Sequence, residues 1–148
     1  MRKPFILVLL VVSIISFYSC KKASTISSSA PTVTKWIFND VTYTGISTSL
    51  NLNLLNAIDS AGDEIYISFY KIPVTQRTYA VNNGMNDTSG CYMQMSVVNG
   101  GSYHSTGQQG NEVNITVTAG KITASFANIA IENYNNFVST VSGTLIQQ

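Results

Sequence analysis

The chain has 148 residues, of which 45% are hydrophobic and only 10% are charged, and its formal net charge is +1 at pH 7. The positive charge is concentrated near the start, because four basic and seven acidic residues follow from Lys35 onward, a balance of −3. This balance excludes the basic surface of a nucleic-acid-binding protein, so no nucleic acid is expected as a partner.

Residues 1–19 have the features of a secretory signal peptide. Arg2 and Lys3 precede an apolar run of 14 residues, 5–18. A membrane-spanning helix needs about 20 apolar residues, so this shorter run predicts a cleavable signal. Ser19, a small residue, then precedes Cys20, and two lysines follow.

The sequence around Cys20, SCKK, resembles the lipobox of Bacteroidota-type bacterial lipoproteins. The resemblance implies that Cys20 becomes the new N-terminus and carries acyl chains such as palmitate. Two or three chains would hold the protein on a membrane almost permanently. The alternatives are an ordinary secretory signal, which leaves Cys20 as a free thiol, or an uncleaved short anchor.

The same resemblance implies a place in the cell envelope, attached to the outer membrane through acylated Cys20. No acidic residue follows Lys21 and Lys22 closely, which slightly favours the periplasmic face over the cell surface. Residues 20–33 are rich in serine and threonine and predict a flexible tether. Residues 34–148 are then expected to form a single domain.

The domain shows short alternating segments separated by turn residues, which predicts antiparallel strands. A hairpin is expected around Asn39–Asp40, and alternating leucines predict a strand over 50–54. The stretch 59–63 (DSAGD) predicts a turn, and a strand over 64–72 should end before Pro73. Further strands are expected at 78–81, 91–97, 103–106, 113–117, 122–131 and 137–146, with turns at 99–101, 119–120 and 133–136.

These segments predict an all-β domain of 8–10 strands, either an antiparallel β-sandwich or a closed β-barrel, with a lipocalin-like topology as one form. The opening hairpin 36–43, the closing segments 113–123 and 141–145, and the lipobox together resemble small Bacteroidota-type lipoproteins of unknown function. The resemblance implies a lipid-anchored all-β domain and carries over no catalytic residue.

Tyrosine is the most unusual feature of the domain. Tyr66 and Tyr70 alternate with Ile65, Ile67 and Phe69, so they share one strand face, and Tyr92 is placed likewise on a later strand. With Trp36 they predict an aromatic face that binds a glycan or a protein. The alternative is that the tyrosines pair across strands and only stabilise the sheet.

Other chemistry has weaker support. Cys91, Met93 and Met95 share a face and His104 lies on the next segment, a soft ligand set that would suit Cu(I), but a packed core explains the first three. His104 could serve a Ser-His-Asp triad, but the sequence has no GxSxG motif for the serine. The acids could supply a glycosidase pair, but most of them lie at turns or strand ends, where turn chemistry explains them. The loop 82–90, with Asn83, Asn86 and Asp87, lacks the spacing of an EF-hand. No metal or cofactor is expected.

Asp59-Ser60-Ala61 resembles the short acceptor sequence for O-glycosylation in such bacteria, and it falls in a predicted turn. Ser60 is therefore a candidate modification site.

Three functions remain open. The first is a non-catalytic envelope module that binds a glycan, peptide or protein, and the second is a lipocalin-like carrier of a small apolar ligand. The large inward side chains favour a filled interior and so the first function. The third is an enzyme whose site the sequence does not reveal.

Overall fold

The structure, a computed structural model, describes residues 32–85 and 87–148. The predicted signal peptide, Cys20 and nearly all of the predicted tether lie outside the described residues. Within the described residues, no helix has the length and apolar character needed to cross a membrane.

The described part of the chain is all-β, as the sequence predicts, and its ten strands agree with the expected 8–10. They are β1 (Lys35–Phe38), β2 (Val41–Asn51), β3 (Leu54–Asp59), β4 (Glu64–Phe69), β5 (Arg77–Asn82), β6 (Gly90–Val97), β7 (Gly101–Ser105), β8 (Glu112–Thr118), β9 (Lys121–Asn133) and β10 (Val138–Ile146).

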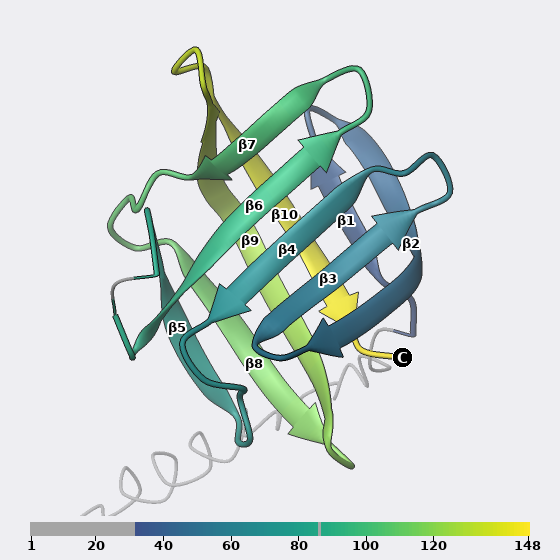
Figure 1. The fold of residues 1–148 in the computed structure, drawn as a ribbon, viewed down its shortest axis with the longest axis vertical. Helices are drawn as coiled ribbons and strands as arrows, with labels where there is room; N and C mark the ends of the chain where they lie inside the picture. The colour runs from purple at the N-terminus through teal and green to yellow at the C-terminus, as the bar shows by residue number, and fades with distance from the viewer. Residues whose placement is uncertain (1–31, 86) are drawn as a thin grey trace, which may run out of the picture.

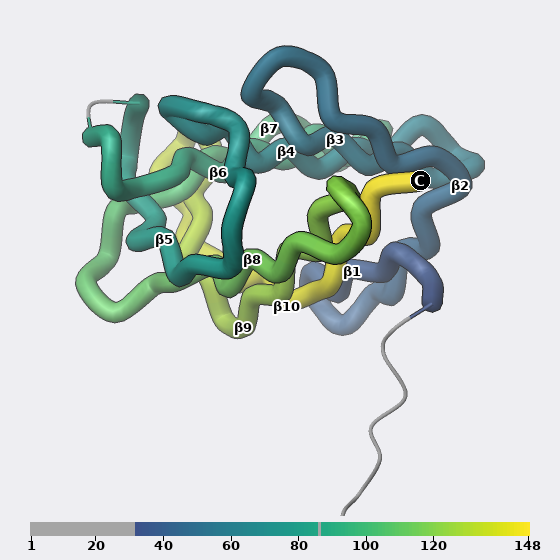
Figure 2. The backbone as a smooth tube through the Cα atoms, turned by 90° about the horizontal axis from the view of Figure 1, so that it is seen from below, coloured from purple at the N-terminus to yellow at the C-terminus, as the bar shows by residue number. Residues whose placement is uncertain are grey.

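All ten strands belong to one sheet with the order β10-β1-β2-β3-β4-β6-β5-β8-β9-β7, and the further pairings β10–β9 and β6–β7 close it into a ring. The ring is flattened. β3, β4, β6 and β7 form a front layer and β1, β9 and β10 form a back layer, with β2 curving between them (Figures 1 and 2). The architecture is therefore that of the predicted sandwich or barrel-like fold.

The strand order departs from the up-and-down order of lipocalins, in which each strand neighbours the next. β6 pairs with β4, while β5 pairs with β6 in parallel and with β8 antiparallel. Along the other edge of β6, β5 contacts its first residues and β7 its last ones. β9 likewise pairs with β8 through its first half and with β7 through its end.

The core follows the alternation seen in the sequence. The predicted inward residues of β4 and β6 are buried, namely Ile65, Ile67, Phe69, Cys91, Met93 and Met95. The corresponding positions of β8 and β9 are buried too, namely Val113, Ile115, Ile122, Ala124 and Phe126. Each buried Val, Ile, Phe or Met side chain among these contributes about 1.5–3 kcal/mol to the stability of the fold.

Positive φ angles mark the predicted tight turns. Asn39 and Asp40 have φ of 48° and 61°, and Ala119 and Gly120 have φ of 51° and 78°. Two successive residues with positive φ match the right-handed twist of the strands that they join. The expected hairpins at 39–40 and 119–120 are confirmed.

The strand predicted over 50–54 is wrong. Asn51 pairs with Leu54, so Leu52 and Asn53 form a hairpin turn between β2 and β3. Leu52 has φ of 54° and is 80% exposed. Asn53 holds the turn against the end of β4, because its backbone carbonyl accepts the N–H of Phe69 at 2.9 Å and its amide donates to the Phe69 carbonyl. This contact between distant residues overrides the local alternation.

β1 has only four residues but pairs with β2 on one side and β10 on the other. Trp36 lies opposite Tyr43 and Gly143 and is wholly buried, with its ring stacked on Tyr43 at 5.4 Å between centroids. A Cβ added to Gly143 would lie 2.6 Å from the Lys35 carbonyl oxygen and 2.9 Å from Trp36 Cα. Only glycine therefore allows β10 to approach β1 this closely.

Thr34 fixes the start of β1 to the rest of the ring. Its hydroxyl lies 2.7 Å from the Thr48 hydroxyl and accepts the N–H of Ile146 at 2.8 Å. Its carbonyl accepts the N–H of Gly45 at 3.0 Å. Buried hydroxyls are stable only when they are hydrogen-bonded, so this network ties the first strand to β2 and to the end of β10.

We predict that Gly143→Ala lowers the free energy of unfolding by about 1–3 kcal/mol, the usual cost of overpacking a well-packed site. The cost arises because the new methyl group meets backbone atoms of β1, which cannot move aside without breaking the β1–β10 ladder. Urea denaturation followed by the fluorescence of Trp36, the single tryptophan, measures it. Thr140→Ala, an exposed change on the same strand, is the control, with a cost below about 1 kcal/mol. Equal costs for both variants would contradict the close-approach argument.

Candidate functional site

A row of five side chains crosses the front layer and continues onto the end of β9. The strand registers place Asn56 of β3 opposite Tyr66 of β4, Tyr66 opposite Gln94 of β6, Gln94 opposite His104 of β7, and His104 opposite Glu132 of β9. Directly opposed residues have Cβ atoms about 4.5–5.5 Å apart, so the row is continuous. We call this set the cross-strand row.

The cross-strand row faces outward because the neighbouring positions along each strand face the core. Ala57 of β3, Ile65 of β4, Met95 of β6, Ser105 of β7 and Ile131 of β9 are all buried. Successive side chains of a strand point to opposite faces, so the residues next to these point to solvent. The front layer faces the viewer in Figure 1.

His104 and Glu132 form a contact at one end of the cross-strand row. The His104 Nε2 atom lies 3.4 Å from the Glu132 Oε1 atom, and the two side chains are 28% and 29% exposed. The imidazole ring also lies 6.0 Å from the ring of Tyr134. Tyr134 belongs to the turn between β9 and β10, where the Asn133 side chain accepts the N–H groups of Asn135 and Phe137 at 2.9 and 3.1 Å.

Tyr92 lies beside the cross-strand row, two residues before Gln94 on β6 and opposite Ser68 of β4. Partial burial raises the pKa of Tyr92, and the nearby Tyr134 phenol raises it further, while interaction with the Gln94 side chain lowers it. Tyr92 therefore lies on the same outer face as Gln94, beside the cross-strand row.

Three side chains of the cross-strand row, Tyr66, Gln94 and His104, line an open groove of about 350 Å³ together with Tyr134, and we call it the tyrosine groove. It is lined by Tyr66, Gln94, Met95, Ser96, Ser102, Tyr103, His104 and Tyr134. Tyrosine rings supply flat apolar surface with a polar tip, and the glutamine amide and the imidazole donate and accept hydrogen bonds. The groove therefore suits a ligand that has both apolar patches and many hydroxyl or amide groups.

The four residues predicted for a binding face are not all in one place. Tyr66 lines the tyrosine groove and Tyr92 flanks it. Tyr70 is 50% exposed but follows the end of β4 and is not among the groove's lining residues. Trp36 is wholly buried against Tyr43, so its place on a binding face is wrong. Trp36 shares a strand face with buried Phe38, whereas Lys35 and Ile37 face outward.

Three residues of the candidate site are not predicted from the sequence, namely Gln94, Glu132 and Tyr134. Glu132 comes next to His104 only because β7 pairs with the end of β9, a contact between residues far apart in the chain. Alternation on the single strands indicates that Gln94 and His104 face outward. No sequence signal gives the register that aligns them.

The copper arrangement considered from the sequence is not formed. Cys91, Met93 and Met95 point into the core and are at most 1% exposed, whereas His104 lies on the outer face. Among residues 32–85 and 87–148, no group of three or more His, Cys, Asp or Glu side chains is placed to hold a metal ion. Burial raises the pKa of the Cys91 thiol from its ordinary value of 9.0 to about 12, which suits a packing role.

The loop considered for calcium is organised as a turn around Asp87. The Asp87 carboxylate accepts the N–H of Ser89 at 2.9 Å and its hydroxyl as well, and these bonds lower the pKa of Asp87. Asn86 lies outside the described residues.

The turn between β3 and β4 is organised in the same way around Asp59. The Asp59 carboxylate accepts the N–H groups of Ala61 and Asp63 at 2.8 and 3.0 Å.

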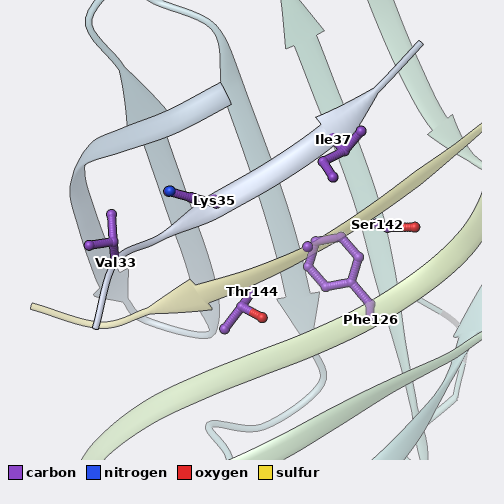
Figure 3. A pocket seen from close by; sticks show the side chains of 7 residues that line it. Val33, Lys35, Ile37, Phe126, Ser142 and Thr144 are labelled. Carbon is purple, nitrogen blue, oxygen red and sulfur yellow. The ribbon is translucent and has the colours of Figure 1, made fainter. Parts of the chain in front are cut away.

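A second groove, of about 390 Å³, lies on the back layer. Figure 3 shows its side chains, Val33, Lys35 and Ile37 leading into β1 and along it, Ser142 and Thr144 on β10, and Phe126 on β9. Its polar side chains are one amine and two hydroxyls. It offers neither the amide nor the imidazole of the tyrosine groove, so we take the tyrosine groove as the candidate site.

Comparison with known protein families, with curated proteins and with solved structures gave no match. The function is therefore argued from the geometry of this chain alone.

We predict that the Cys91 thiol is protected in the folded protein. At about pH 8 a thiol with a pKa near 12 is almost wholly protonated, and only the thiolate reacts with iodoacetamide. In a Cys20→Ser chain, labelling should be slow in native buffer and fast in denaturant. Ser60→Cys, combined with Cys20→Ser and Cys91→Ala, provides an exposed control thiol that should label quickly in both conditions. Fast native labelling of Cys91 would contradict its buried position.

The same shift gives a pH dependence. The unfolded chain releases the Cys91 proton near pH 9.0, whereas the folded chain keeps it until about pH 12. The folded state thus binds more protons in this window, so the contribution of Cys91 to the free energy of unfolding falls as the pH rises through it.

Ser60 remains a predicted O-glycosylation site. It is exposed at the tip of the turn between β3 and β4, where a modifying enzyme can reach it. We expect the protein from its native cell to lose mass on chemical deglycosylation, and the Ser60→Ala variant to show no change. An unchanged mass for the native protein would remove this prediction.

Proposed function

We propose that this chain is a non-catalytic module of the cell envelope, anchored by acylated Cys20, that binds a partner through the tyrosine groove. The observation that carries the proposal is the cross-strand row, in which five strands each contribute one outward side chain able to hydrogen-bond. Tyrosine rings flank this row. Surfaces that combine aromatic rings with polar groups are typical of recognition sites.

The proposed location is the outer membrane, with the periplasmic face slightly favoured over the cell surface. Support comes from the sequence of residues 1–22, in which a short apolar run ends at Ser19-Cys20 and two lysines follow. An anchored module would meet its partner near the membrane, where a moderate affinity is sufficient because both partners are held close together.

Binding within the ring, as in a carrier of a small apolar ligand, has less support. The interior positions hold large side chains that are less than 2% exposed, among them Trp36, Phe69, Leu55, Met93 and Leu145. A carrier needs an internal cavity comparable with its ligand. The tight packing of these side chains favours a site on the outer surface.

Catalysis also has less support. His104 and Glu132 form a pair, but both are more than a quarter exposed, and His104 lines an open groove. Catalytic groups usually act in sites from which water is excluded, because electrostatic effects are stronger there. The exposed pair fits better with hydrogen bonding to a bound partner.

The test is recovery of the partner from native envelopes by the anchored chain after cross-linking. The double variant Gln94→Ala with Tyr134→Ala removes two exposed side chains of the groove and should lose most of the recovered material. Tyr70→Ala is the matched control, since it removes an exposed tyrosine outside the groove, and it should recover as much as the wild-type chain. Equal recovery by both variants would exclude the tyrosine groove, and no specific recovery by the wild-type chain would exclude a binding role.

A further inference from the structure

We propose that the tyrosine groove binds an uncharged oligosaccharide that lies across the strands along the cross-strand row. This inference rests on the proposed function and narrows its partner to one chemical class. It is carried by the spacing, the hydrogen-bonding groups and the charge of the groove.

The spacing of the side chains along the cross-strand row suits a ligand built of repeating units. From Tyr66 to Glu132 the row passes over β4, β6, β7 and β9, with one side chain from each strand. Neighbouring strands lie about 4.8 Å apart, so these four side chains span roughly 14 Å. An extended oligosaccharide lying across the strands would contact one new side chain of the row at each strand that it crosses.

The groups along the row match the two kinds of surface on a sugar. A sugar ring has apolar C–H faces, which pack on the flat rings of Tyr66, Tyr92 and Tyr134. It also has hydroxyls, each of which donates and accepts a hydrogen bond. The Gln94 amide does both, the Glu132 carboxylate accepts, and an imidazole nitrogen of His104 donates or accepts.

The charge of the groove argues against an acidic ligand. The outward residues of β3, β4, β6 and β7 and the end of β9 carry only Glu64, Glu132 and His104 as ionisable groups other than tyrosine. None of the four basic side chains of the described residues lines the groove, namely Lys35, Lys71, Arg77 and Lys121. Recognition of phosphates or uronic acids uses arginine or lysine, so an uncharged ligand fits best.

A protein partner fits the groove less well. A stable protein interface buries about 800 Å² on each partner around an apolar centre. Beside Tyr66, Gln94 and His104 the outward positions include three serines, Ser68, Ser96 and Ser102, and the aliphatic Leu54 and Ile58 lie only at the β3 end of the row. Most exposed aliphatic residues lie on other elements, such as Ile37 of β1, Val41 of β2 and Val138 of β10.

The test is isothermal titration calorimetry of the full chain, purified in detergent from the cell that produces it. The probes are uncharged hexasaccharides of β-1,4-glucose, α-1,4-glucose and mannose, an acidic hexasaccharide of galacturonic acid, and the neutral and acidic glycan fractions released from the native envelope. We expect at least one uncharged probe to bind with a Kd in the micromolar to millimolar range and the acidic probes to bind far more weakly.

Variants locate the binding. Gln94→Ala with Tyr134→Ala should weaken it by about tenfold or more, the loss expected for one hydrogen bond and one stacked ring. Tyr70→Ala should leave the Kd within about twofold, since that ring lies outside the groove. Unfolding in urea, followed by Trp36 fluorescence, shows that each variant is folded.

Each contrary result overturns the inference. These results are no measurable binding of any uncharged probe, equal or tighter binding of an acidic probe, or equal changes in Kd for the groove and control variants. A different outcome separates the two proposals. If no uncharged probe binds, but cross-linking still recovers a protein and this recovery requires Gln94 and Tyr134, the glycan inference fails and the proposed binding function stands. If cross-linking fails as well, both fail together.

Discussion

The closure of the ring depends on the contact between Trp36 and Gly143. β1 is short, and it must pair with β2 and β10 at once while the largest side chain of the chain points from it into the core. This is possible because Gly143 has no Cβ, so the β10 backbone comes directly against Trp36. The burial of the indole ring on Tyr43 and the hydrogen bonds of Thr34 then hold the first and last strands together. Without this closure, β1 and β10 would each expose an edge.

The closed ring leaves polar and reactive side chains accessible only on its outer surface. The interior is filled by side chains that are inert where they lie, and even the Cys91 thiol stays neutral because burial raises its pKa to about 12. Polar and aromatic groups are left on the outer face of the front layer, where they carry little of the packing. Stability therefore depends mainly on one face of each strand, and binding on the other.

The position of β7 explains why the site forms at this end of the front layer. β5 and β8 fill the space between β6 and β9 at one end of the ring, and β7 fills it at the other. Because β7 bridges β6 and β9, His104 lies between Gln94 and Glu132 in one register. If β7 paired with β6 alone, Glu132 would not be placed beside His104 by this strand.

Much of the fold follows from local sequence, and most of the candidate site does not. Alternation predicts the inward residues of β4 and β6, because a strand with one buried face repeats every two residues. Asn-Asp and Ala-Gly gave two tight turns, because such residues tolerate or adopt positive φ. Local pattern failed at Leu52, where the turn depends on Asn53 meeting Phe69, and at Trp36, where the inward face of β1 had to be chosen. The His104–Glu132 contact depends on register between distant strands, which loop closure and core packing decide together and which no local pattern encodes.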